Sequence, residues 1–186
     1  MPLPAPDARQ HRHRRTLTMD GYFRDDGMLD VEGHLVDIKS YDFHNETRGQ
    51  VMAGTPVHDM WLRLTLDEHL TVKDVAVSID ASPHPICPAI APAFNKLKGE
   101  RIKPGWNIRV RELLGGVEGC THVVEMLGPL GTVAYQTMGP SRVRAPGTPP
   151  PDPNKPSPRI GTCHAMAPDS PVVKKRWPQF YTGKDA

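Results

Sequence analysis

The feature that most constrains this chain is a change of hydrophobic period near its middle. Residues 57–67 and 72–80 alternate apolar and polar side chains, and the short turn 67–69 joins them. Such period-two alternation is typical of antiparallel strands that bury one face. After residue 83 the apolar side chains recur at helical spacing instead. We therefore expect a strand hairpin followed by helices that cover one face of its sheet.

Three helices are predicted after this hairpin. The first begins at Pro88 and ends near Gly99, and a short second helix spans 106–114. Proline suits a first helical turn, and glycine commonly follows a last one. The third helix spans 120–138 and contains the step Gly128-Pro129. Because proline has no N–H to donate, this step predicts a kink in the helix.

The residues before the hairpin are predicted to be an N-terminal β-hairpin extension. Strand-like residues 16–25 and 29–38 flank Asp26-Gly27, which is a strong turn signal. The apolar face of the second strand changes from odd to even positions after Gly33, which predicts a bulge there. Residues 40–56 contain glycine, asparagine and proline and are predicted to form a long loop.

These elements predict an α+β fold, an antiparallel sheet followed by three helices packed on one face. Residues 1–13 are predicted to be a flexible arm and 14–139 a single domain with its core at 57–138. Eleven of the 21 prolines lie in 140–178. We predict that 140–186 is a Pro-rich extension whose aromatic end packs back in part.

Composition excludes several partners and compartments. The net charge is +2, with 23 basic and 21 acidic residues, so nucleic acid is not expected as a partner. No apolar run is long enough for a membrane span or a signal peptide, so we expect a cytoplasmic protein without a membrane partner. Thiols stay reduced in that compartment, so Cys87, Cys120 and Cys163 are not expected to form disulfides.

Five residues that can carry chemistry lie at the ends of predicted elements. His58 and Asp59 begin a strand, Cys87 begins the first helix, and Cys120 and His122 begin the third. A sheet with helices on one face can bring these ends together. Thiolate and imidazole together suit zinc or iron.

Two other interpretations stay open at this point. Cys87 and Cys120 can be small buried hydrophobes, with His58 a hydrogen-bonded core histidine. Alternatively, Cys120 is a nucleophile, with His58 as its base and Asp59 orienting that base. His122 follows Cys120 by two residues on a helix, so its ring is expected to point away from the thiol.

Further residues are candidates for the surroundings of this site. Because long loops are often functional and arginine binds carboxylates, four side chains are predicted to bind a substrate: Tyr41, His44, Arg48 and Arg63. The pair Cys163-His164 either completes the site or is exposed by chance.

Several longer motifs resemble a known family. The strings DGMLDVEGHLVDIKSYDF, AGTPVHDMWLRLTLD, PICPAI and GGVEGCTHVVEML resemble the bacterial family of unknown function number 2889, over about residues 14–140. The later string CHAMAPDSPVVKKRWPQFY is similar to the end of that family. The family name implies no activity.

A more distant resemblance implies a shared metal site. Residues 57–138 resemble the NifU/IscU-like iron–sulfur scaffold fold in element order. The resemblance implies that Cys87, Cys120 and His122 share one site, with Asp59 in the place of a loop aspartate. The first cysteine of that fold has no counterpart. A cluster needs about three or four thiolates, and this core offers two, which disfavours an iron–sulfur cluster.

With this resemblance, a mononuclear site is the better expectation. His58, Cys87, Cys120 and His122 would bind zinc tetrahedrally, with iron as the alternative, and Asp59 can replace one ligand. We expect a metal-dependent lyase or hydrolase that acts on a small molecule, with His58, Asp59 and Cys120 as catalytic residues. The resemblance implies bacterial catabolism of aromatic or acyl compounds.

The alternatives to this enzyme are a carrier or scaffold for metal, iron–sulfur or sulfur, a metal-free cysteine enzyme, and a structural zinc domain. A carrier would expose its cysteines, whereas a structural site would be closed by four protein ligands. A homo-oligomer is possible.

Overall fold

The computed structural model describes residues 3–139 and 152–183. The chain divides into two compact units, 1–142 and 143–186. The first unit is an α+β domain, as the sequence predicts, and it contains the sheet and the longest helix. The second unit contains short helices.

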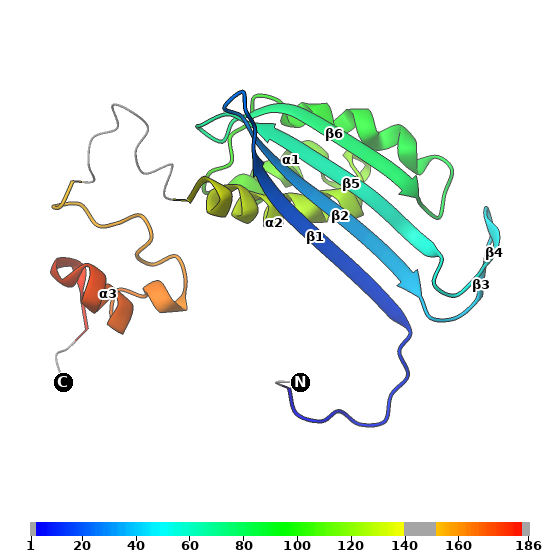
Figure 1. Cartoon of the computed structure of the whole chain (residues 1–186), viewed down its shortest axis with the longest axis horizontal. Helices are drawn as coiled ribbons and strands as arrows, with labels where there is room; N and C mark the ends of the chain where they lie inside the picture. The colour runs from blue at the N-terminus through cyan, green and yellow to red at the C-terminus, as the bar shows by residue number, and fades with distance from the viewer. Residues whose placement is uncertain (1–2, 140–151, 184–186) are drawn as a thin grey trace. The chain divides into compact units, whose positions relative to one another are not determined.

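The first unit is built on a four-stranded antiparallel sheet in the order β1-β2-β5-β6 (Figure 1). Its strands are β1 (His13–Phe23), β2 (Leu29–Lys39), β5 (Pro56–Leu66) and β6 (Val72–Ala81). β2 pairs with β1 on one side and with β5 on the other. The N-terminal hairpin is therefore half of the main sheet and not the extension that the sequence predicts.

The predicted bulge at Gly33 is wrong. Gly33 pairs in continuous register with both neighbouring strands, and the shift in the β2–β5 ladder lies between Asp37 and Ile38. A Cβ at Gly33 would lie 3.2 Å from Met126 Sδ of the helix above it. The glycine is needed because a helix approaches the strand closely at this point, which is a different use of the residue from a bulge.

The predicted loop 40–56 contains a small two-stranded hairpin of its own. It consists of β3 (Phe43–Asn45) and β4 (Gly49–Val51). Asn45 Oδ1 accepts hydrogen bonds from the backbone N–H groups of Thr47 and Arg48 and so closes the turn. Strands this short leave almost no alternation in a sequence.

Four helical segments follow the sheet in the first unit: η1 (Cys87–Leu97), α1 (Trp106–Leu114), the short η2 (Gly116–Glu118) and α2 (Thr121–Met138). The first is a 3-10 helix, because Pro88 and Pro92 lack the N–H groups that α-helical hydrogen bonds require. α2 is continuous through the proline at its centre. Among the described residues, no helix is both long and apolar enough to cross a membrane.

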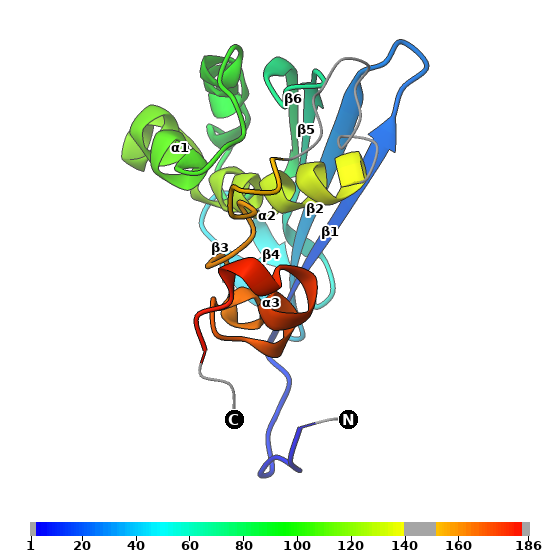
Figure 2. The same cartoon turned by 90° about the vertical axis from the view of Figure 1, so that its left-hand side faces the viewer.

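These helices cover one face of the sheet, the inner face (Figures 1 and 2). α2 packs against β1, β2 and β5, η1 packs against β6, and α1 packs against α2 and η1. Trp106 Nε1 donates a hydrogen bond to the Leu127 carbonyl at 2.9 Å and fixes α1 to α2. The core is mostly aliphatic, and its strand residues include Leu29, Val31, Leu35, Met60, Leu62, Leu64 and Leu66.

The second unit has η4 (His164–Met166), α3 (Pro171–Arg176) and η5 (Pro178–Phe180). Ser170 accepts a hydrogen bond from the Val173 N–H and caps α3. The predicted packing of this extension against the domain stays a prediction.

Candidate functional site

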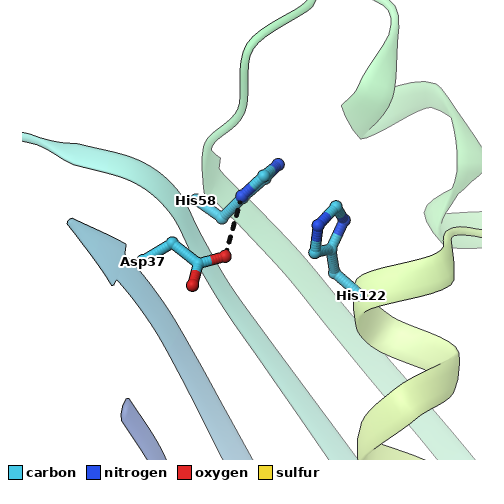
Figure 3. Close-up of side chains that lie close together, drawn as sticks. All are labelled: Asp37, His58 and His122. Carbon is cyan, nitrogen blue, oxygen red and sulfur yellow. Dashed lines mark hydrogen bonds and ion pairs between the residues drawn. The ribbon is translucent and has the colours of Figure 1, made fainter. Parts of the chain in front are cut away.

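Three side chains meet on the inner face, at the end of the sheet that the N-terminus of α2 covers. They are Asp37 of β2, His58 of β5 and His122 in the first turn of α2 (Figure 3). Each offers one ligand atom, and these atoms lie within 4.8 Å of one another. A carboxylate and two imidazoles at this spacing can hold a metal ion or exchange a proton.

Sheet register and helix packing explain why they meet. Asp37 is the cross-strand partner of His58, so both side chains project from the same face of the sheet. α2 packs along β1 and β2, which places its N-terminus above this pair. His122 is the second residue of that helix.

Asp37 is a buried carboxylate whose hydrogen bonds come from three side chains. Arg15 donates from Nε at 2.9 Å and from Nη2 at 2.8 Å, in a bidentate pair. His13 Nε2 lies 2.9 Å from Oδ1, and His58 Nδ1 lies 3.0 Å from Oδ2. Arg15 also forms an ion pair with Glu125 of α2 at 2.5 Å. The carboxylate is thus held rigidly.

These contacts keep Asp37 ionised. Burial raises the pKa of Asp37, but the hydrogen bonds and charge of Arg15, with the hydrogen bonds from His58 and His13, outweigh burial and lower the pKa to about 2. Because an ionised carboxylate only accepts, His58 Nδ1 must carry the proton of their shared hydrogen bond. The other ring nitrogen, Nε2, is then a free acceptor, turned away from Asp37 in Figure 3.

The two imidazoles lie against each other and favour the neutral form. Their ring centroids are 3.8 Å apart, with 32° between the planes. Burial, and then the charge of His122, lowers the pKa of His58. Burial and the charge of Arg15 lower the pKa of His122. Neutral imidazole is the form that binds metals and accepts protons.

Cys120 lies at the edge of this group. Its Sγ is 4.0 Å from His122 Nδ1. The expectation that the ring points away from the thiol is wrong, because Cys120 is the extended N-cap residue (φ −102°, ψ 123°) and precedes the first helical residue. Cys87 is half-buried at the start of η1 and is not a member of the Asp37, His58 and His122 group.

Asp59 projects from the opposite, outer face of the sheet. Its Oδ1 lies 2.7 Å from His34 Nε2, and the His34 ring stacks on Trp61 with centroids 3.7 Å apart. Neighbouring residues of a strand alternate between faces, so Asp59 cannot share the face of His58. The carboxylate that lies within hydrogen-bonding distance of His58 is Asp37 and not Asp59.

The structure brings none of the four predicted substrate-binding residues into the group of three. Arg48 is exposed and donates a hydrogen bond to the Pro56 carbonyl, and His44 is exposed in β3. Tyr41 is half-buried next to β3. Arg63 projects from the outer face, where it pairs with a glutamate of β2. Their role with a substrate stays a prediction.

Cys163 and His164 belong to the second unit. Cys163 is exposed, and His164 begins η4. That they complete the site stays a prediction.

Two surface hollows lie away from the group of three. One of about 570 Å³ is bordered by α2, α1 and β1, with Asn107, Thr132 and Gln136 among its lining residues. The other, of about 280 Å³, lies over β5 and β6 and is lined by Trp61 and Arg63 among others.

Sequence reasoning missed Asp37, Arg15 and His13. The available signal was a charged residue at an odd position of β2, where Leu29, Val31 and Leu35 define the inner face. The predicted bulge reversed the faces after residue 33 and moved Asp37 to the outside. An aspartate in the buried register of a strand indicates a paired or functional carboxylate.

Comparison with protein families identifies the domain. The family model described as "Protein of unknown function (DUF2889)" matches residues 13–136, which run from the start of β1 into α2 and include all three side chains of the group. Comparison with curated proteins and with solved structures found no match.

Proposed function

The chain belongs to this family of unknown function, and from the geometry of its site we propose that it is a metal-dependent enzyme of lyase or hydrolase type that acts on a small molecule. The observation that carries the proposal is the approach of Asp37, His58 and His122 to within 4.8 Å. Zinc and non-haem iron both bind pairs of imidazoles in proteins.

The contacts suggest separate roles for the three residues. Asp37 already accepts hydrogen bonds from Arg15, His13 and His58, so it orients the His58 ring. A carboxylate behind a ligating imidazole is a common arrangement in metal sites, and it sets the tautomer of the ligand. His58 Nε2 and a ring nitrogen of His122 then face the ion.

Cys120 is the third donor that we propose. Two donors bound to one tetrahedral zinc are about 3.5 Å apart, from bond lengths of about 2.0 and 2.3 Å. The Cys120 Sγ lies 4.0 Å from His122 Nδ1, so a small rotation of the thiol would bring both atoms to an ion. Such a set leaves a position for water or substrate, as catalytic zinc sites do.

A bound zinc would polarise a substrate carbonyl or lower the pKa of bound water toward ~7. The protein supplies the rest of the chemistry. Both imidazoles have lowered pKa values and are neutral, which suits ligation. Where one of them is not a ligand, it can accept a proton from the substrate.

A cysteine nucleophile is the second candidate, and one distance supports it. Cys120 Sγ and His122 Nδ1 are 4.0 Å apart, so His122 can serve as the base in place of His58. Cys120 also lies at the N-terminus of the 18-residue helix α2, where free N–H groups stabilise a thiolate.

The resemblance in element order to iron–sulfur scaffolds supports a carrier instead, although Cys87 and Cys120 are both half-buried.

Elemental analysis combined with thiol alkylation separates these candidates. We expect full-length protein purified without an affinity tag to contain about one zinc or iron per chain. Cys120 should then react with iodoacetamide only after a chelator is added, because a bound thiolate is protected. Cys87→Ala serves as the control for the other core cysteine.

The opposite result would favour the cysteine nucleophile over the metal site. Metal-free protein whose Cys120 alkylates readily, and more slowly after His122→Gln, would show a thiol activated by an imidazole. A protein that binds metal, loses it rapidly and passes it to an acceptor would favour the carrier.

A further inference from the structure

β1 is an edge strand whose outer edge has no partner among residues 3–139 and 152–183. Its ladder partner in the described chain is β2, in a register without breaks over all eleven residues. It contains no proline. A long edge of free N–H and C=O groups attracts another strand unless charge, proline, bulges or a cover prevents it.

The side chains of β1 add apolar surface to this edge. Leu17 is 41% exposed, Tyr22 49% and Phe23 57%, although α2 packs against the inner face of the same strand. Leu17 projects from the inner face, since its cross-strand partner is the buried Leu35. The helix layer therefore leaves the inner face at this edge partly uncovered.

The charges on β1 are arranged for pairing with a copy of itself. Arg14 and Asp20 are both exposed, and both project from the outer face, six residues apart. Among the described residues, neither has a salt-bridge partner. In an antiparallel pair of β1 strands centred on Leu17, residues whose numbers add to 34 face each other. Arg14 then faces the partner's Asp20, twice in each dimer.

We propose that two copies of this chain pair through the edges of β1, antiparallel and centred on Leu17. The two four-stranded sheets then form one continuous sheet of eight strands. Two further facing pairs fit this register: Leu17 meets the partner's Leu17 on the inner face, and Thr16 meets the partner's Thr18 on the outer face. Isologous pairing of this kind closes as a two-fold dimer.

A face-to-face dimer through the outer surface of the sheet is the weaker arrangement. Acidic side chains project from the outer face on all four strands, and they outnumber the arginines there: Asp20, Asp30, Glu32, Asp59 and Asp74. Stacking two such faces would bring like charges together. Edge pairing instead brings opposite charges together.

Charge reversal tests the register without disturbing the core, because Arg14 and Asp20 are exposed. Sedimentation velocity across a concentration series would measure the dimer dissociation constant of full-length wild type, Arg14→Glu, Asp20→Arg and an equimolar mixture of the two variants. Each single variant places like charges together twice and should weaken the dimer by roughly tenfold or more. The mixture should restore it, since both contacts in the heterodimer are attractive again.

Three outcomes would overturn the proposal. One is a wild type that stays monomeric at all concentrations. Another is a dimer that neither reversal weakens, which would show a different interface. The third is a mixture no tighter than the single variants, which would exclude this register. Circular dichroism of each variant confirms that the fold is retained. Weakening of the wild-type dimer by added salt would support the charge pairs.

Discussion

Two carboxylate–imidazole pairs join β2 to β5, and they lie on opposite faces of the same sheet. Asp37 and His58 form the inner pair at 3.0 Å, while Asp59 and His34 form the outer pair at 2.7 Å. The same chemical groups therefore occur within a few residues of each other, on the same two strands.

The surroundings of the two pairs differ. The Asp37 side chain is 3% exposed, whereas that of Asp59 is 27% exposed. The inner pair has the Arg15 guanidinium and a second imidazole beside it, whereas the outer pair has the flat face of an indole. The comparison shows that a carboxylate and a histidine become a candidate site where burial removes water and where other charges fix their ionisation.

Removal of the inner carboxylate should give the largest effect on stability. Asp37→Asn removes the charge of a buried carboxylate that Arg15 binds in a bidentate pair, so we expect the free energy of unfolding to fall by roughly 3 kcal/mol. Urea denaturation at neutral pH measures the change. A loss smaller than about 1 kcal/mol would mean that the inner pair contributes no more than a surface pair.

Acid should remove part of the stabilisation that ionised Asp37 gives the folded chain, and it should do so in a defined pH range. The pKa of Asp37 is lowered from 3.8 to about 2 in the folded chain, so the unfolded chain takes up the proton first. The contribution of Asp37 to the free energy of unfolding is complete above about pH 4 and is lost as the pH falls toward 2. The shift in the pKa of Asp37 corresponds to about 2 kcal/mol.

The difference in unfolding free energy between wild type and Asp37→Asn measures this contribution at each pH. We expect the difference to narrow by about 2 kcal/mol between pH 4.5 and pH 2. Asp67, whose pKa is also lowered to about 2, titrates in both proteins and cancels from the difference. A constant difference across this range would contradict the ionisation assigned to Asp37.

The outer pair should show the smallest effect. Asp59→Asn changes one partially exposed hydrogen-bonded pair, so we expect a change below about 1 kcal/mol in the same denaturation experiment. Zinc binding should be unaffected, because Asp59 lies on the other face of the sheet. If Asp59→Asn cost as much as Asp37→Asn, burial would not be what separates the two pairs.

Much of the fold is predictable from periodicity and glycine signals. The predicted strands 57–67 and 72–80 agree with β5 and β6, and the predicted helices 106–114 and 120–138 agree with α1 and α2. These elements bury one face against the core, so their apolar residues repeat regularly. β3 and β4 were missed because three residues are too few to show a period.

The candidate site was predictable in part. His58, Cys120 and His122 lie near the ends of elements, as their positions in the sequence predict. Asp37 and Arg15 were missed because their roles depend on strand register, which brings residues 22 positions apart into contact. The bulge predicted at Gly33 assigns the later residues of β2 to the wrong faces of the sheet. Asp37 is therefore not recognised from the sequence as a buried carboxylate of the site.

The most direct test of a metal site at His58 and His122, with Asp37 orienting His58, is a zinc titration of metal-free protein by isothermal titration calorimetry. Wild type is compared with His122→Ala and with His34→Ala, which removes the matching imidazole of the outer pair. We expect about one zinc per chain for wild type and His34→Ala, and affinity at least ~10-fold weaker for His122→Ala. Equal affinity in wild type and His122→Ala, or no binding by wild type, would contradict a metal site on the inner face.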